Sequence, residues 1–173
     1  NGTTYNSFII QGKKTALIDT SHEKFEELWL DLLKKQIDPK EINYLIVSHT
    51  EPDHSGLISN ILDLNSDIEI YASKVAIQFL KNQVHKPFKS TPIKTGSELP
   101  LGINPCNGIN HTIEFISAPN LHWPDTICSF DHGTSILYTC DAFGLHYCSQ
   151  ELFDIQPEKI APDFRYYYDC LMG

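Results

Sequence analysis

One eight-residue segment places four side chains that can bind metal within six positions. It reads Ser48-His49-Thr50-Glu51-Pro52-Asp53-His54-Ser55 and directly follows the apolar run at 44–47. That run predicts a strand, and alternation along it directs His49 and Glu51 to one side. The Pro-containing turn then directs Asp53 and His54 to a neighbouring point. The arrangement predicts a metal site, and two adjacent metals fit it better than one. The alternative is a polar loop whose histidines cap the following helix.

Two further candidate ligands follow later predicted strands. His122 lies in Asn120-Leu121-His122-Trp123-Pro124-Asp125, after the predicted strand at 112–117, and Asp141 follows the predicted strand at 135–139. Taken alone, a loop histidine or a turn aspartate is more often structural than metal-binding. Each of these places one ligand at the end of a strand, as the first segment does. Together with that segment, we interpret both as ligands.

Composition and charge limit the classes of protein. The 173 residues suffice for a single domain with a sizeable core. The formal net charge of −9 disfavours nucleic acid and anionic membrane surfaces as partners, because both repel an acidic protein. The sequence shows no apolar run of membrane-spanning length. The five cysteines are odd in number and include no C-x-x-C pair, so neither a disulfide framework nor a zinc ribbon is indicated, and a reducing cytoplasm is the simplest location.

The apolar pattern predicts strands early and late in the chain, with helices between them. Predicted strands lie at 7–10, 15–19, 44–47, 69–72, 91–94, 112–117, 126–131 and 135–139. Predicted helices lie at 57–62, at 75–80 and along a five-residue apolar face formed by Phe25, Leu28, Trp29, Leu32 and Leu33. The Pro- and Gly-rich run at 87–105 is predicted to be mostly surface-exposed apart from the strand at 91–94. This order indicates an α/β or α+β layered domain and not a doubly wound nucleotide fold.

Three motifs resemble the metallo-β-lactamase-like domain of flavodiiron proteins. They are His49-x-Glu51-x-Asp53-His54, the segment at 120–125, and Cys140-Asp141-Ala142-Phe143-Gly144-Leu145-His146, and the resemblance runs nearly from end to end. The segments at 2–7 and 161–165 are most similar to the diflavin flavoproteins of cyanobacteria and other oxygenic phototrophs. The resemblance implies an αββα sandwich truncated at both ends, since Asn1 is no initiator Met and the helix-like pattern at 164–173 stops abruptly. Flavodoxin-like and flavin reductase domains are expected C-terminal to residues 1–173.

The resemblance also implies a ligand set for two iron ions. The residues are His49, Glu51 and His122 for one iron, Asp53 for the second, and Asp141 as the bridge between them. His54 would be either a ligand of the second iron or lie just outside its ligand set. The family takes one further His, in a Gly-His-Gly context, from a segment that would lie beyond residue 173.

Glu51 favours iron over zinc. Zinc hydrolases that resemble this domain carry a second His at this position, and a carboxylate there makes the site harder and more anionic. Glu51, Asp53 and Asp141 would supply three negative charges against four positive charges from two ferrous ions, which leaves a nearly neutral centre. Zinc cannot change valence, so a zinc-loaded form could only polarise water for hydrolysis.

Other residues near the predicted ligands have two interpretations each. His146 would orient the bridging carboxylate or supply protons to dioxygen, or it would be a structural His. Trp123, Phe143 and Tyr147 would wall the pocket and keep it dry, or they would pack in the core. The Cys140 thiol is expected to point away from the metals, into the core, because alternation along the strand places it opposite the next residue. The remaining histidines fall in predicted turns or solvated segments and are not interpreted as ligands: His22, His85, His111 and His132.

The expected function is that of the diiron catalytic module of an NAD(P)H-dependent O2 reductase, which reduces dioxygen to water with electrons delivered through FMN. FMN and FAD would be bound by domains outside residues 1–173. A head-to-tail homodimer, or a heterodimer with a related chain, would bring the FMN of one subunit to the iron site of the other. The alternatives are a nitric oxide reductase, a zinc-dependent hydrolase of the metallo-β-lactamase type, and a non-catalytic module that binds O2 or a partner protein.

Overall fold

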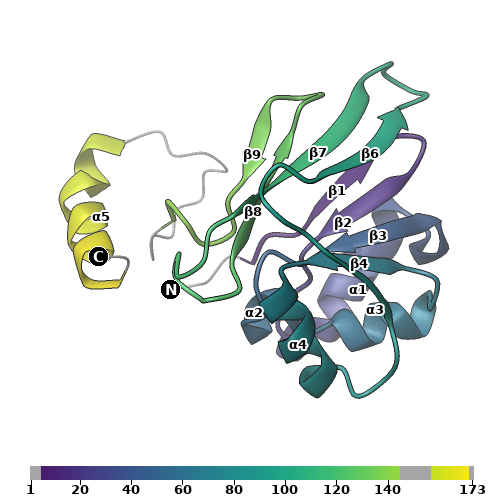
Figure 1. Cartoon of the computed structure of the whole chain (residues 1–173), viewed down its shortest axis with the longest axis horizontal. Helices are drawn as coiled ribbons and strands as arrows, with labels where there is room; N and C mark the ends of the chain where they lie inside the picture. The colour runs from purple at the N-terminus through teal and green to yellow at the C-terminus, as the bar shows by residue number, and fades with distance from the viewer. Residues whose placement is uncertain (1–4, 145–156, 172–173) are drawn as a thin grey trace.

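The computed structural model of the chain describes residues 5–144 and 157–171. Two β-sheets pack face to face, and helices cover the outer face of the first sheet (Figure 1). The first sheet has the order β1 (Phe8–Gln11), β2 (Thr15–Ile18), β3 (Ile42–Ile46), β4 (Glu69–Ala72) and β5 (Lys89–Pro92). The second has the order β6 (Glu98–Ile103), β7 (Asn110–Ser117), β8 (Ile127–Asp131) and β9 (Ile136–Tyr138). The helices are α1 (Glu26–Gln36), α2 (Pro52–Ser55), α3 (Ile58–Leu64), α4 (Lys74–Gln83) and α5 (Pro157–Leu171), with 3₁₀ turns at Glu23–Phe25 and Pro39–Glu41.

Buried aliphatic side chains form a layer on each face of the first sheet. β2 shows the division: Leu17 packs with the helices, Ala16 and Ile18 pack with the second sheet, and all three are at most 1% exposed. A strand buried on both faces has a continuous apolar run, which is why 16–18 does not alternate with polar residues. The loops at the ends of these strands are therefore held by close-packed layers on both sides.

The parallel strands of the first sheet bring the metal-binding segment to one edge. β2 pairs with β3 in parallel, with Ile18 beside Ile46, and β3 pairs in parallel with β4. The carboxyl ends of parallel strands meet at the same edge of a sheet, where ligand sites commonly lie. Asp19 and Ser48, which follow β2 and β3, therefore lie side by side and are joined by a hydrogen bond of 2.7 Å.

β6 is a strand that the sequence prediction missed. It lies within the run at 87–105 that we predicted to be mostly surface-exposed, and that prediction is wrong for 98–103. Leu99 and Leu101 face the core and are 4% and 1% exposed, so the alternation of a strand is present. Pro100 and Gly102 conceal it, and a Pro is tolerated there because β6 is an edge strand. The strand predicted at 91–94 begins earlier, as β5 at Lys89–Pro92.

α1 exposes part of the apolar face predicted for it. Leu33 is buried, and Trp29 packs against the core and donates its indole N–H to the Ser7 hydroxyl at 2.9 Å. Leu28 and Leu32 are 60% and 51% exposed, so the prediction of a five-residue core face is wrong for these two. They lie on the flank of the stripe through 29 and 33, because successive helical residues are about 100° apart.

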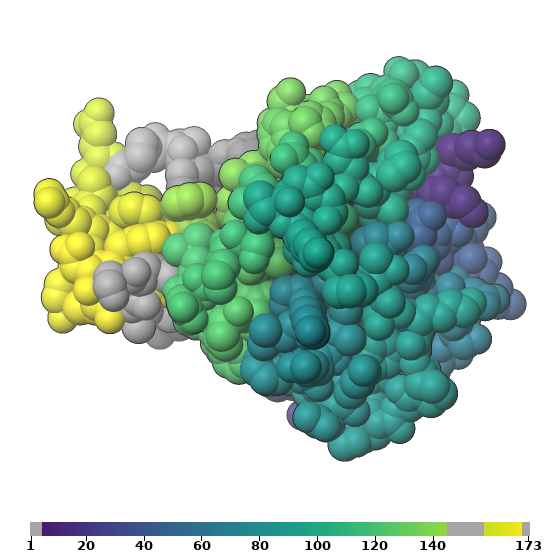
Figure 2. Space-filling view, in the orientation of Figure 1, coloured from purple at the N-terminus to yellow at the C-terminus, as the bar shows by residue number. Residues whose placement is uncertain are grey.

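The predicted layered α/β class is confirmed for the described residues. α1, α3 and α4 lie on the first sheet, and within 5–144 and 157–171 no helix covers the outer face of the second (Figure 1). α5 forms one end of the molecule (Figure 2), where the Tyr168 hydroxyl accepts a hydrogen bond from the Phe143 amide. Among the helices of the described residues, none combines the length and the apolar character needed to cross a membrane.

His111 is a buried strand residue, so its assignment to a turn or solvated segment is wrong. It lies on β7, is 5% exposed, and has its Nδ1 2.7 Å from Asp131 Oδ2 on β8. Asp131 also accepts hydrogen bonds from the Thr134 hydroxyl and the Gly133 amide. Burial opposes ionisation of Asp131, but these hydrogen bonds outweigh it and lower its pKa. The alternation of β7 buries this imidazole, and Asp131 supplies the partner that the burial requires.

We expect Asp131→Asn to lower the free energy of unfolding by about 1–3 kcal/mol near neutral pH, because His111 loses a charged partner in the core. The pKa of Asp131 is lower in the folded protein than its ordinary 3.8, so its contribution is present above that value and is lost as the pH falls through the folded-state pKa. Urea unfolding at neutral and acidic pH measures both effects. The control is Glu114→Gln, which breaks the exposed pair between Glu114 on β7 and His132 in the turn after β8 and should cost less than about 1 kcal/mol. An equal loss of unfolding free energy in the two variants would contradict the conclusion that Asp131 is the buried partner of His111.

Candidate metal centre

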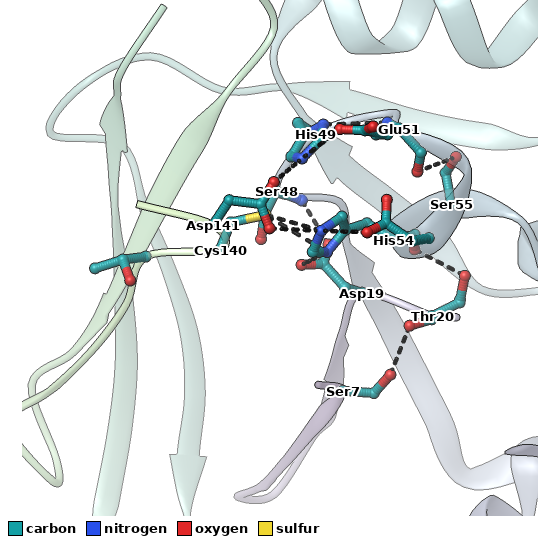
Figure 3. A network of polar contacts seen from close by, with 12 residues as sticks. Ser7, Asp19, Thr20, Ser48, His49, Glu51, His54, Ser55, Cys140 and Asp141 are labelled. Carbon is teal, nitrogen blue, oxygen red and sulfur yellow. Dashed lines mark hydrogen bonds and ion pairs between the residues drawn. The ribbon is translucent and has the colours of Figure 1, made fainter. Parts of the chain in front are cut away.

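Side chains from three separate loops meet at one edge of the molecule. The loops are 47–51 with α2, which follow β3, the connection 118–126 between β7 and β8, and 139–144, which follows β9. Figure 3 shows Asp141 and Cys140 facing His49 and His54 from a different part of the chain. The centre is therefore assembled by the tertiary fold.

The turn of α2 sets the direction of two predicted ligands. β3 ends at Ile46, and α2 begins at Pro52 with Glu51 as its N-cap. A Pro at the first helical position already has a helical φ, so it starts the turn directly after Glu51. Asp53 and His54 therefore project from a helical turn and not from an extended strand, and His54 is 8% exposed.

His49, Glu51, His122 and Asp141 form the first group of possible ligands, with ligand atoms within 4.8 Å of one another. His49 Nε2 is 2.8 Å from Asp141 Oδ2, and His122 Nε2 is 3.3 Å from the same oxygen. Glu51 Oε2 lies 3.3 Å from His122 Nε2 and 4.0 Å from His49 Nε2. Two imidazoles and two carboxylates thus face one point, which is a donor set suited to a transition metal.

His54 lies on the other side of the Asp141 carboxylate. Its Nε2 is 2.9 Å from Asp141 Oδ1, whereas His49 contacts Oδ2. The ring centroids of His49 and His54 are 4.6 Å apart. The two oxygens of one carboxylate therefore meet imidazoles from two directions, a geometry that suits a carboxylate between two adjacent metals.

Asp53 reaches the same region with one oxygen unpaired. Its Oδ2 is 3.6 Å from His54 Nε2, and its Oδ1 is buried with no hydrogen-bond partner among the described residues. A buried carboxylate oxygen without a partner is costly, so this atom calls for a cation or a donor. The unpaired oxygen beside His54 fits a second metal position.

The Cys140 thiol points toward the centre, so the expectation that it points away is wrong. Its Sγ is 3.5 Å from His54 Nδ1. β9 ends at Tyr138, so strand alternation does not extend to residue 140. Cys140 has a φ of +58°, in the left-handed region, and this turns its side chain to the same side as that of Asp141. Burial is the main cause that raises the pKa of this thiol to about 12.

Two buried carboxylates that hold the metal-binding segment were missed in the sequence. One oxygen of Asp19 accepts the Ser48 N–H at 2.7 Å, and its other oxygen is 3.5 Å from His54 Nδ1. Asp125 accepts both the N–H and the hydroxyl of Thr50 at 2.8 Å. Both carboxylates are at most 3% exposed. The only signal in the sequence was their place, Asp19 as the last residue of a predicted strand and Asp125 directly before another.

Asp141 and His54 hold each other in their charged forms. Burial opposes ionisation of Asp141, but hydrogen bonds with His49 and His54 outweigh it and hold its pKa well below the usual range. Burial also opposes protonation of His54, but hydrogen bonds with Asp141 and Asp19 outweigh it and raise its pKa. The proton on His54 thus supplies positive charge where a cation could sit, and metal binding would release it.

Aromatic side chains flank the centre. The Trp123 ring centroid is 5.5 Å from that of His49, which favours the interpretation that Trp123 walls the site. Phe143 is 62% exposed and stacks on Tyr168 of α5 at 6.5 Å, so packing in the core is excluded for Phe143. The other two residues given a role from the sequence, His146 and Tyr147, lie outside the described residues.

A family model described as ODP family beta lactamase matches residues 3–172. The chain belongs to this family. Diflavin flavoprotein A 1 of Synechocystis sp. is 60% identical over 173 residues, which is 100% of this chain and 29% of that protein. The anaerobic nitric oxide reductase flavorubredoxin of Aliivibrio fischeri is 38% identical over 174 residues, which cover 98% of this chain and 34% of that protein. The solved metal-soaked Flv1 flavodiiron core of Synechocystis sp. superposes with a TM-score of 0.87 at 30% identity, over 98% of this chain and 41% of that one.

These similarities confirm the resemblance of this ODP-family domain to the flavodiiron core and its metallo-β-lactamase-like fold. The chain spans only 29% and 34% of the length of the two curated relatives. The similarity therefore identifies the domain and not, by itself, the reaction of a whole protein.

Proposed function

We propose that this ODP-family domain binds two iron ions and is the catalytic core of an O2 reductase. One observation carries the proposal: the two oxygens of Asp141 face imidazoles from two directions. Glu51 lies beside the first of these directions and Asp53 beside the second. A carboxylate placed between two groups of imidazole and carboxylate donors suits two adjacent iron ions.

The described residues supply most of the ligands that two irons need. The first iron would be held by His49, Glu51 and His122, the second by Asp53 and His54, and Asp141 would bridge them. Glu51 adds a hard, anionic donor, which favours iron over zinc. The buried, unpaired oxygen of Asp53 would gain a cation as its partner.

Bound iron would supply the electrons and the open coordination positions that dioxygen reduction needs. The chain supplies orientation: Asp19 lies against the Nδ1 of His54, and Asp125 fixes Thr50, the residue between two ligands. Such outer partners hold the rings of metal-binding imidazoles in place. His146 is proposed to orient the bridging carboxylate or to supply protons.

The lengths of the relatives support a larger electron-transfer protein, since this chain matches 29% of a diflavin flavoprotein. We propose that electrons from NAD(P)H pass through FAD and FMN bound outside residues 1–173. A head-to-tail pair of subunits, identical or related, would place the FMN of one beside the iron centre of the other. The described free cysteines fit a reducing cytoplasm.

Nitric oxide is the second candidate substrate. The Aliivibrio fischeri relative is named as an anaerobic nitric oxide reductase and is 38% identical to this chain. The same six ligands would serve either reaction, so the ratio of O2 to NO consumption by one preparation decides between them.

Metal analysis of the intact protein tests the proposal. We expect two irons per chain, a ferric absorption spectrum in air, and O2 consumption with NADH or NADPH. Two zincs with hydrolysis of thioesters or lactams would overturn the proposal in favour of a metallo-β-lactamase-type hydrolase. A folded, metal-free protein without turnover would overturn it in favour of a non-catalytic module that binds O2 or a partner protein.

A further inference from the structure

Cys140 brings a sulfur atom to a centre otherwise built from imidazole and carboxylate. Its Sγ is 3.5 Å from His54 Nδ1 and 3.8 Å from His54 Nε2. Ligand atoms of His49, His54, Cys140 and Asp141 lie within 4.8 Å of one another. In Figure 3 the sulfur and the Asp141 carboxylate both face the His54 ring. The proposed iron chemistry makes no use of this sulfur.

We propose that Cys140, His54, Asp141 and His49 bind a thiophilic divalent cation such as zinc, at a position that overlaps the proposed iron centre. Thiolate and imidazole are the ligands that zinc prefers in proteins. With a zinc–sulfur bond of about 2.3 Å and a zinc–nitrogen bond of about 2.1 Å, tetrahedral geometry separates the two ligand atoms by about 3.6 Å. The distance of 3.8 Å between Cys140 Sγ and His54 Nε2 is close to this spacing.

A small movement would bring His54 and Asp141 to the spacing of zinc ligands. His54 Nε2 and Asp141 Oδ1 are 2.9 Å apart, a hydrogen-bond distance. A tetrahedral zinc would separate a nitrogen and an oxygen ligand by about 3.3 Å, so a small rotation of either side chain suffices. The thiol would release its proton to solvent as the zinc–sulfur bond forms, and zinc would take the place of the direct contact between His54 and Asp141.

A cavity beside the centre gives a cation access to the sulfur. It has a volume of about 380 Å³, and Ser48, Asp53, His54 and Cys140 are among its lining residues. Ser48 is 1% exposed, and its hydroxyl has no hydrogen-bond partner among the described residues. A water molecule on a cation held by Cys140 would give this buried hydroxyl a partner. The unpaired hydroxyl is thus an independent sign of a ligand in the cavity.

Zinc at this position would exclude iron from part of the centre. It would take His54 and Asp141, and zinc stands above ferrous iron in affinity for nitrogen, oxygen and sulfur ligands. This consequence rests on the proposed iron function, whereas the sulfur-containing site rests on the described side chains alone. Zinc would accordingly act as an inhibitor of iron loading.

Cobalt(II), a spectroscopic substitute for zinc, tests the site in the intact protein stripped of metal. We expect a sulfur-to-cobalt charge-transfer band in the near ultraviolet that is lost in Cys140→Ser and retained in the control Cys128→Ser, which changes a buried thiol on β8. Zinc affinity should fall at least about tenfold in Cys140→Ser. No such band in the parent protein, or a band that persists in Cys140→Ser, would overturn the proposal.

Alkylation of the unmutated protein gives a second test that needs no variant. Zinc should slow the alkylation of Cys140 measured by peptide mass spectrometry, whereas the exposed Cys106 and Cys170 should react at unchanged rates. Equal rates at Cys140 with and without zinc would overturn the site. Iron content and O2 consumption are measured on separate samples. A protein that shows the cobalt band but never binds iron would retain this site and refute the proposed function. A protein that binds two irons and consumes O2 but shows no cobalt band would support the proposed function and refute the zinc site.

Discussion

Asp141→Asn should leave at most one metal per chain and lower O2 reduction by the intact protein at least about 100-fold. Asn keeps the size of the side chain but removes its charge and one of its two acceptor oxygens. In the structure, one oxygen meets His49 and His122 and the other meets His54. The amide nitrogen of Asn is a hydrogen-bond donor and not a metal ligand, so one of the two metals would lose the ligand that residue 141 supplies. Iron content by elemental analysis and O2 uptake measure the two effects.

Asp63→Asn is the matched control for this prediction. The same chemical change is made on an exposed carboxylate that pairs with Lys86 at the surface. This variant should keep two irons and the parent rate, because surface pairs contribute little to structure. If Asp141→Asn instead binds two irons and turns over normally, Asp141 is only a turn residue and the bridge is absent.

Four of the six candidate ligands could be picked out because their signals are local. His49 to His54 occupy six positions after one apolar run, and no tertiary knowledge is needed to see that they share a loop. The sequence signals for His122 and Asp141 were weaker, since each is the only candidate ligand in its segment. The structure brings His122 Nε2 within 3.3 Å of Asp141 Oδ2, so the two residues do meet at the ends of their strands. Their roles as ligands stay predictions until a metal is measured.

The supports of the centre were not predictable in the same way. Asp19 reaches His54 only because β2 and β3 pair in parallel with a fixed register, and Asp125 reaches Thr50 only across two loops. Neither Asp19 nor Asp125 belongs to a sequence motif that would reveal this contact. For Cys140, a single backbone dihedral decides whether the sulfur faces the core or the centre, and period-two alternation ends before it. Strand register and a left-handed backbone conformation at a non-Gly residue are both set by the surrounding structure and not by the local sequence pattern.

The difference between local patterns and contacts made across the fold also explains the errors in the fold prediction. β6 has alternating leucines, but Pro100 and Gly102 indicate a loop by composition, and only pairing with β7 makes this segment an edge strand. His111 looks polar and solvated along the sequence, but the pairing of β7 with β8 places Asp131 within 2.7 Å of its ring. A partner supplied by another strand turns a polar residue into a core residue.

Glu51→His should shift the metal preference of the intact protein toward zinc and abolish O2 reduction. Glu51 Oε2 lies 3.3 Å from His122 Nε2, so the substituted imidazole would join His49 and His122 as a third nitrogen donor. Three imidazoles are a common zinc site, whereas the carboxylate supplies the hard, anionic donor that favours iron. The substitution also removes one negative charge from the centre and makes its oxidised form less stable. Competition between iron and zinc, read by elemental analysis, measures the shift.

The control for Glu51→His is Glu27→His, which makes the same change at an exposed position in the first turn of α1. It should leave the ratio of iron to zinc and the rate of O2 uptake unchanged, which separates the loss of a ligand from the general effect of adding a histidine. Glu51→His could also bind two irons and consume O2 at the parent rate. That result would show that the carboxylate at this position does not select the metal, and the argument for iron from the donor set would fail.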